Sequence, residues 1–242
     1  MPPAALLSDF PHFHGIKPLQ TISENDFQSL VAGARLLEAD KFGPKVLLTP
    51  SGRIVKLFRR KSLMSSAALF PYASRFAENA RRLAMLDIPS VDVSAVLRIP
   101  SQKRDAVVYP LLPGTALRSV LDAASPEERK ALLLRLADFC AHLHQLGVHF
   151  RSLHLGNVLL TPDQRFALID IADLRCRRFS LGPLARIRNL GALLRLKSDR
   201  DYIEEAGMRL FIDRYLASAS MPRKALAVAS WLSRSPWRPA LT

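Results

Sequence analysis

"LHLGNVLLTPDQRFALIDIAD", residues 153–173, is the stretch of sequence that decides the fold. Two short apolar runs, at 158–160 and 166–169, flank a polar turn, a pattern typical of two strands joined tightly. Asn157 stands before the first run and Asp170 after the second. We therefore expect the two side chains to lie close together. Their oxygens are suited to a divalent cation, which would bridge nucleotide phosphates.

A long capped helix precedes this stretch, at residues 125–147. Ser125 and Glu128 form a capping box, Pro126 takes the first helical position, and Gly147 ends the helix. Its apolar stripe is Leu132, Leu136, Phe139, Leu143 and Leu146. Three further helices are expected on the C-terminal side, at 184–196, 202–218 and 224–232. The second half is therefore mainly helical.

The first half is predicted to be rich in strands. Short runs of Val, Ile and Leu with turn residues between them predict strands at 45–49, 53–58, 91–100 and 105–112. A helix is expected at 71–87, and a shorter one begins with Thr21 and Glu24 at capping-box spacing. Strands followed by helices favour an α+β fold with two lobes. We expect an irregular arm at 1–20, one lobe at 21–112 and a second at 113–242.

Composition narrows the setting without choosing a partner. The 242 residues carry 35 Lys and Arg against 21 Asp and Glu, a net charge of +14. Such a surplus favours nucleic acid, acidic lipid headgroups or phosphorylated sugars, although each basic cluster also fits a solvated face. No signal peptide or run of about 20 apolar residues is visible. Two cysteines make no disulfide framework, so we expect a reducing, cytoplasmic location.

Lys56 and Glu78 add a second pair of candidates. Lys56 lies in a short apolar strand, where a buried ammonium is costly unless paired, and Glu78 in the next helix is a plausible partner. Alone, each signal also fits a solvated side chain or, for Asp170, a cap. Their order is the specific feature: Lys in a strand, Glu in a helix, a loop ending in Asn, a strand, then Asp. This is the arrangement of phosphoryl-transfer enzymes of the protein kinase type.

Residues 147–180, "GVHFRSLHLGNVLLTPDQRFALIDIADLRCRRFS", followed by "LARIRNLGALLRL" at 184–196, resemble the lipopolysaccharide core kinases. These enzymes phosphorylate Kdo or heptose sugars, and the closest likeness is to the branch called toluene tolerance proteins. The likeness spans roughly residues 36–216. It implies a bilobal protein-kinase-like fold, with a small strand-rich N-lobe and a mainly helical C-lobe, that uses ATP and Mg²⁺.

The resemblance also implies roles for individual residues. Lys56 would hold the α- and β-phosphates, oriented by Glu78, while Asn157 and Asp170 would bind the metal. The adenine would lie at a hinge near Tyr109 and Leu111, and Gly43 is the glycine in the region that covers the phosphates. The acceptor would be a lipopolysaccharide core sugar or another anionic glycolipid. Peripheral contact with the cytoplasmic face of the inner membrane would follow.

Four positions depart from the family pattern. Ser152 occupies the place of the catalytic aspartate, Phe150 replaces the usual histidine, Gly43 is a lone glycine, and Asp170 is followed by Ile and Ala. Loss of a general base typically costs about 10² to 10⁴ in rate. His154 is the candidate that would accept a proton or steady a phosphate in its place, unless it is merely a hydrogen-bonded loop residue. The sequence thus leaves open an active kinase and a pseudokinase that retains the fold, with or without nucleotide.

Two other classes receive less support. Nucleic-acid binding rests on net charge alone, without interleaved aromatic residues or a reader motif, and is not expected. A zinc site is not expected either, because His142 and His144 are two residues apart on a helix and point to different sides. The C-terminal tail, with Trp231 and Trp237 among basic residues, fits either a packed helix or a membrane-surface helix.

Overall fold

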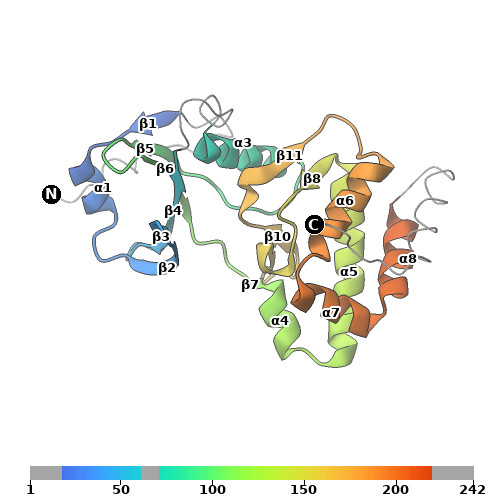
Figure 1. Ribbon diagram of the computed structural model, residues 1–242. Helices are drawn as coiled ribbons and strands as arrows, with labels where there is room; N and C mark the ends of the chain where they lie inside the picture. The colour runs from blue at the N-terminus through green and yellow to red at the C-terminus, as the bar shows by residue number, and fades with distance from the viewer. Residues whose placement is uncertain (1–17, 61–70, 220–242) are drawn as a thin grey trace. The chain divides into compact units, whose positions relative to one another are not determined.

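The computed structural model describes residues 18–60 and 71–219 and divides the chain into two compact units (Figure 1). The first unit contains Met1–Pro113 and also Leu168–Asp173, whereas the second contains Gly114–Ala167 and Leu174–Thr242. The expected helix at 224–232 and most of the expected N-terminal arm lie outside the described residues. The mixed composition of strands early and helices later confirms an α+β fold.

The first unit is built on a six-stranded sheet in the order β1-β5-β6-β4-β3-β2. Neighbouring strands are antiparallel, except that β1 runs parallel to β5. The strands are β1 (Leu19–Thr21), β2 (Arg35–Asp40), β3 (Gly43–Leu48), β4 (Arg53–Arg59), β5 (Ala95–Ile99) and β6 (Arg104–Pro110). β3 to β6 match the expected strands. The prediction of an irregular arm over residues 1–20 is wrong at its C-terminal end, where β1 begins. β2 was not predicted.

The first helix, α1 (Glu24–Leu30), begins later than its sequence signal indicates. Thr21 belongs to β1, so it cannot cap a helix. The N-cap is Ser23, whose side chain accepts a hydrogen bond from the Asp26 N–H, and Asp26 completes the capping box. The expected Thr21–Glu24 box is therefore wrong by two residues at each position.

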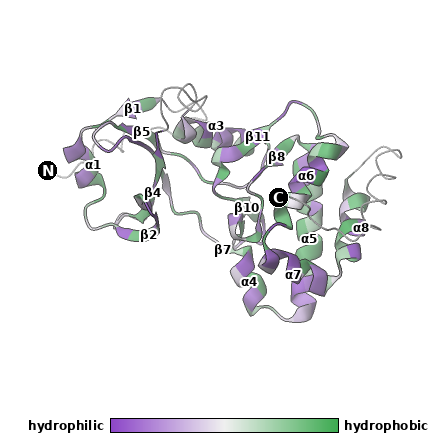
Figure 2. Cartoon of the chain, in the orientation of Figure 1, coloured by the Kyte–Doolittle hydropathy of each residue, from purple (hydrophilic) through white to green (hydrophobic). Residues whose placement is uncertain are grey.

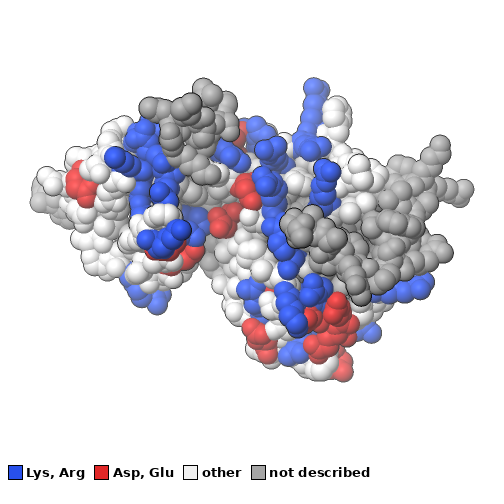
Figure 3. All heavy atoms as spheres, in the orientation of Figure 1, with Lys and Arg blue, Asp and Glu red and all other residues white. Residues whose placement is uncertain are grey.

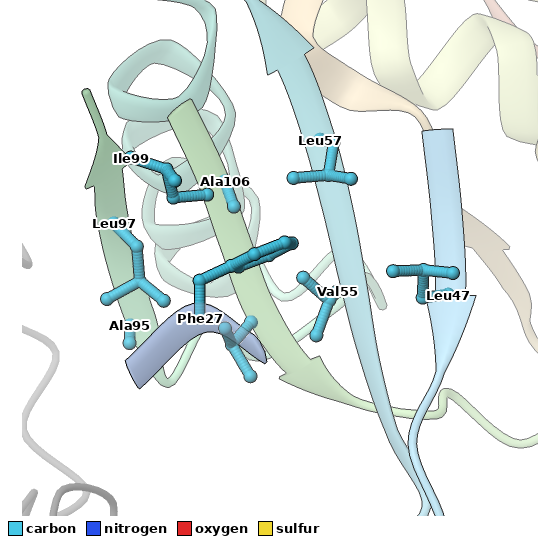
Figure 4. Packing of buried hydrophobic residues seen from close by; sticks show 9 residues of the cluster. Phe27, Leu47, Val55, Leu57, Ala95, Leu97, Ile99 and Ala106 are labelled. Atoms are coloured by element: carbon cyan, nitrogen blue, oxygen red, sulfur yellow. The ribbon is translucent and has the colours of Figure 1, made fainter. Parts of the chain in front are cut away.

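The two faces of the sheet bury different helices. Figure 4 shows Phe27 of α1 packed among Val55, Leu57 and other apolar residues of one face. Because side chains alternate along a strand, Lys56 and Phe58 point to the opposite face. There α3 (Tyr72–Met85) packs, with the Phe76 ring 5.9 Å from Phe58 and 5.6 Å from Tyr109 between centroids. This alternation places a lysine on the α3 side of the sheet.

The second unit is mainly helical. Its helices are α4 (Leu117–Ala123), α5 (Pro126–Gln145), α6 (Pro183–Leu193), α7 (Lys197–Ala206) and α8 (Met208–Ser218). The capping box of Ser125 and Glu128 at the start of α5 is confirmed. The expected helix at 202–218 is interrupted, because Gly207 has a φ of 101° and separates α7 from α8. α7 is largely hydrophilic (Figure 2), and its buried residues are Asp199 and Ile203.

Short strands and turns connect these helices. They are β7 (Thr115–Ala116), β8 (Val148–Phe150), β9 (Val158–Leu160), β10 (Phe166–Leu168) and β11 (Leu174–Cys176). β10, β9 and β7 form one small sheet, and β11 pairs with β8. The 3-10 turns η2 (Leu155–Asn157) and η3 (Ile171–Asp173) follow β8 and β10. Residues 153–173, the stretch that decides the fold, therefore end at η3, which belongs to the first unit.

Candidate active site

Lys56 and Asp170 form an ion pair within the first unit. The Lys56 Nζ lies 2.9 Å from an Asp170 carboxylate oxygen, and the side chains are 9% and 42% exposed. Asp170 has a φ of 54°, in the left-handed region that few residues other than Gly, Asn and Asp adopt. The pair puts a buried cation and a half-exposed carboxylate together, which suits binding of phosphate and metal.

Three hydrogen bonds hold the backbone around Asp170 in the first unit. Leu168 N–H donates to the Pro89 carbonyl at 2.9 Å, and the Ser90 hydroxyl donates to the Leu168 carbonyl at 2.7 Å. The buried Asn79 of α3 donates its amide to the Ile171 carbonyl at 2.7 Å. Because both sides of Asp170 are fixed, its carboxylate is directed to Lys56 by the backbone.

Glu78 has other partners than the expected Lys56. Its carboxylate accepts hydrogen bonds from the guanidinium of Arg81 at 2.9 Å and from Arg82 at 2.7 Å. These partners lie three and four residues along α3, where helix geometry brings side chains together. The hydrogen bonds from Arg81 are the main cause of a Glu78 pKa lowered to about 2, and burial opposes them. The structure thus replaces the expected Lys56–Glu78 pair with Lys56–Asp170.

The β2–β3 hairpin takes the place of a glycine-rich phosphate loop. Its tip is pinned: Phe42 N–H donates to the Asp40 side chain at 2.8 Å, and Arg104 donates to the carbonyls of Phe42 and Pro44. The Arg59 guanidinium lies 3.5 Å from the centroid of the Phe42 ring. Gly43, with a φ of 105°, supplies the conformational freedom at the start of β3. This hairpin offers one glycine, and arginines of the strands β4 and β6 contact its tip.

The expected adenine region lies at the end of β6. Tyr109 is buried and stacks on Phe76 with an interplanar angle of 22°. Burial, with Asp170 and Glu38 nearby, raises the pKa of the Tyr109 phenol, so the ring stays neutral. Leu111 is exposed, and its backbone N–H donates to the Gly52 carbonyl at 3.0 Å. The exposed residue, rather than the buried ring, is the one available to a ligand.

In the second unit, the loop after β8 orients Asn157 and His154. The Asn157 amide nitrogen donates to the Ser152 carbonyl at 3.0 Å, so its oxygen is the atom left to bind a cation. His154 caps η2: its Nδ1 accepts the Gly156 N–H at 3.1 Å. A ring nitrogen that accepts carries no proton, so neutral His154 carries its proton on Nε2. In this tautomer Nε2 is a hydrogen-bond donor. It is therefore better suited to bind an anion than to act as a general base.

The side chains that hold this loop were not among the residues predicted to be functional. Asp199 is fully buried: one carboxylate oxygen accepts the Leu155 N–H at 2.7 Å, and the other accepts Arg118 at 2.9 and 2.7 Å. At the other end of the loop, Asn189 accepts the Phe150 N–H at 3.2 Å and donates to the Phe150 carbonyl. These partners come from α4, α6 and α7, far apart in sequence. Ser152 and His154 therefore lie on a loop fastened at both ends.

Asn189 also belongs to a buried polar network. The oxygen of Asn189 can only accept, so His144 donates to it through Nε2 at 3.0 Å, and its Nδ1 accepts from Tyr215 at 2.8 Å. Burial lowers the pKa of His144 to about 4. His144 therefore has a structural role. Within residues 18–60 and 71–219, no group of three or more His, Cys, Asp or Glu side chains is placed to hold a metal ion.

Comparison with known protein families identifies the class of this protein. The model of the family described as "APH: Phosphotransferase enzyme family" matches residues 44–196, more than half of the chain. The chain therefore belongs to this phosphotransferase family, which includes enzymes with a protein-kinase-like fold. Lys56, Ser152, Asn157 and Asp170 all fall within the match. None of the curated proteins matches the chain.

Family membership supports a kinase or transferase activity and does not identify the substrate. Members of this family generally use ATP and Mg²⁺. Residues 44–196 match the wide family, and this match does not distinguish the lipopolysaccharide core kinase or toluene tolerance branch within it. No helix within the described part of the chain has the length and apolar character needed to cross a bilayer.

Proposed function

We propose that this protein transfers a phosphoryl group from ATP, with Mg²⁺, to an alcohol group. The observation that carries the proposal is the Lys56–Asp170 pair, which lies inside the region matched by the phosphotransferase family. Phosphoryl transfer draws on positioning and on neutralisation of charge, and a buried lysine beside a metal-binding carboxylate supplies both.

Each unit carries side chains of the kind that would suit the metal or the nucleotide. Asp170 is half-exposed and offers carboxylate oxygens, and Asn157 keeps its side-chain oxygen free of the bond to Ser152. Such hard oxygen ligands suit Mg²⁺, which would neutralise phosphate charge when bound. Lys56 would bind phosphate oxygens, and the backbone near Leu111 would meet the adenine. His154 would donate its Nε2 proton to a phosphate oxygen.

The acceptor proposed is a lipopolysaccharide core sugar or another anionic glycolipid, in the cytoplasm. The resemblance of residues 147–196 motivates this choice, and the net charge of +14 favours an acceptor that carries phosphate or carboxylate groups. Ser152 would hydrogen-bond the acceptor hydroxyl, whose proton would leave to a phosphate oxygen or to water as the new O–P bond forms. Such an enzyme would rely on orientation more than on general-base catalysis.

A pseudokinase is the second candidate, and two observations favour it. Ser152 is a poor base, and the β2–β3 hairpin has a single glycine where a glycine-rich loop is usual, with the residues on both sides of that glycine bonded to Arg104. Such a protein would bind nucleotide, or only keep the fold, as a regulatory or binding module.

One experiment separates the two candidates. Purified protein is titrated with ATP in the presence and absence of Mg²⁺ by calorimetry, and phosphate transfer to core oligosaccharide is then followed with labelled ATP. Mg²⁺-dependent binding with transfer supports the enzyme, and binding without transfer to any acceptor tried supports the pseudokinase. Absence of ATP binding contradicts the proposed phosphotransferase.

A further inference from the structure

The segment from β11 through α6 to the start of α7 is basic and contains no acid. Residues 174–198 include no Asp or Glu, whereas basic residues recur throughout. Five of these are exposed arginines, which we call the arginine face: Arg175, Arg177, Arg178, Arg188 and Arg195. In Figure 3, Lys and Arg side chains follow the part of the second unit that carries β11 and α6, and acidic side chains gather around α4 and α7.

The arginine face is not neutralised within the described residues. Among residues 18–60 and 71–219, none of its five arginines forms an ion pair with Asp or Glu. Other basic residues of this unit do: Arg118, Arg129, Lys197 and Arg214 each contact a carboxylate. Exposed cations gathered without counter-charges produce a local positive potential that attracts anions.

The same segment holds two large apolar side chains in water. Phe179 is 76% exposed and Leu184 is 69% exposed. The backbone beneath Phe179 is fixed, because Arg177 N–H donates to the Gly147 carbonyl at 2.9 Å and Leu181 N–H to the His144 carbonyl at 2.8 Å. A Cβ at Gly147 would lie 2.5 Å from the carbonyl oxygens of Arg177 and Phe179, so the loop packs closely on this turn. An anchored backbone thus presents Phe179 outward.

The segments outside the described residues are also poor in acidic side chains. Residues 220–242 contain four basic residues and no acidic one, and residues 61–70 contain one lysine and no acidic residue. Residues 1–17 contain Asp9 as their only acidic residue. These segments therefore offer the arginine face almost no counter-charge.

We propose that the arginine face, with Phe179 and Leu184, docks this protein on an anionic lipid bilayer. Guanidinium groups pair with headgroup phosphates, and an aromatic and an aliphatic side chain enter the boundary between headgroups and acyl chains. A single-stranded nucleic acid would instead need a groove with several stacking aromatics, and Leu184 offers no ring for stacking. This inference gives the expected membrane contact a defined surface and does not depend on phosphotransfer.

The test is co-sedimentation of the full chain with vesicles of phosphatidylcholine alone or mixed with phosphatidylglycerol. We expect binding to the mixed vesicles only, weakened by salt. Each basic residue near an anionic surface is worth about fivefold in affinity, so the variant R175Q/R177Q/R178Q should bind about 100-fold more weakly. Replacement of the same three residues by Lys should restore most of the binding, since point charges suffice. F179S/L184S should weaken binding about tenfold or more.

The matched control removes the same charge elsewhere on the second unit, in K130Q/R165Q/R209Q, and should stay within about threefold of the parent protein. All substituted positions are exposed, and melting curves confirm that each variant folds. No binding to mixed vesicles, or equal loss in the control, overturns the proposal. Binding of single-stranded RNA that the arginine variant abolishes, without vesicle binding, assigns the face to nucleic acid and overturns it as well. ATP binding, measured separately, reports on the proposed phosphotransferase and not on this surface.

Discussion

The Lys56 ammonium lies 2.9 Å from the Asp170 carboxylate, on the face of the sheet that packs against α3. The lysine is nearly buried, so this carboxylate is what compensates its charge. The same carboxylate is the proposed metal ligand. Binding of Mg²⁺ and phosphate would therefore supply both partners with new counter-charges, since Lys56 gains a phosphate and Asp170 gains a cation. The free protein is stabilised by the pair that the proposed substrate complex would rearrange.

Replacement of Asp170 by Asn tests the proposed metal role. Asn retains the size of the side chain and tolerates the left-handed φ of 54°, so the backbone should persist. Loss of the charge should lower Mg²⁺-dependent affinity for ATP by about 10-fold or more, because a neutral amide is a weaker ligand. Calorimetric titration of ATP with and without Mg²⁺ measures the change.

Asp170→Gly is a second variant that tests the same role. Gly also accepts a positive φ, and it removes the whole side chain. Both variants should lose the dependence of binding on Mg²⁺ and, like Asp170→Ala, should lower the melting temperature because Lys56 loses its counter-charge. Asp170→Ala should lower it further, because Ala is strained at this positive φ. Mg²⁺-dependent affinity that is intact in the Asn and Gly variants would contradict the assignment of Asp170.

Ser152→Asp tests whether the missing carboxylate limits catalysis. The loop backbone is held by Asn189 and Asp199, so the new side chain should occupy the place of a general base without moving the loop. A positioned base is typically worth about 10² to 10⁴ in rate, and nucleotide affinity should stay within about threefold. Initial rates of ATP turnover compare the two proteins. A lower rate in the variant would show that Ser152 takes part in a different geometry.

How far the sequence predicts this structure depends on the range of each signal. α5 was predicted with its cap and its end because those signals are local: Ser125, Glu128 and Gly147 act on their own helix. Lys56 was recognised because a lysine in an apolar strand demands a partner. Its partner was assigned to Glu78, yet Glu78 has two arginines within one turn of α3. The partners of Glu78 are set by the local geometry of α3. The order of distant elements in the sequence did not reveal them.

The side chains that hold the loop after β8 could not be predicted from the sequence for a related reason. Asp199 looks like an ordinary residue of a polar helix, yet in the folded chain it is buried and bonded to Leu155 of η2 and Arg118 of α4. Arg118 lies 81 residues earlier, and nothing in its own segment marks it. A buried acid beside an arginine becomes visible only in three dimensions. The break between α7 and α8 was marked in the sequence by Gly207, which interrupts an otherwise helical pattern.

Arg118→Met should destabilise the second unit by leaving the buried Asp199 charge without its cation. Breaking a buried pair is costly, and partial exposure of Arg118 lowers the penalty to about 2 kcal/mol. The double variant with Asp199→Asn removes the stranded charge, so it should be more stable than the sum of the two single changes by about 1 kcal/mol. Equilibrium unfolding in urea measures all three variants. Strict additivity would show that the two side chains do not act together.

Gly147→Ala should destabilise the protein through a steric contact. The residue has a φ of 76°, and a Cβ there would lie 2.5 Å from two carbonyl oxygens. Gly52→Ala is the matched control, because Gly52 has a φ of 74° and nothing within 4 Å of the added atom. The control should cost about 1 kcal/mol from backbone conformation alone, and Gly147→Ala clearly more. Melting curves compare the two, and equal losses would contradict the close packing of the loop on Gly147.

Stability of the second unit should fall in mild acid because His144 is buried as the neutral base. Burial lowers its pKa to about 4, whereas the unfolded chain titrates near the ordinary value of 6.5. Below pH 6.5 the unfolded state binds a proton that the folded state refuses, so the free energy of unfolding decreases as the pH falls towards 4. Between pH 7 and pH 5 the contribution is about 2 kcal/mol. His144→Gln lacks this proton. Its free energy of unfolding should therefore decline less towards pH 5. At pH 7 it should be lower than that of the parent protein, because the buried hydrogen bonds of His144 to Tyr215 and Asn189 are disturbed. Parallel declines in both proteins would rule out His144 as the source.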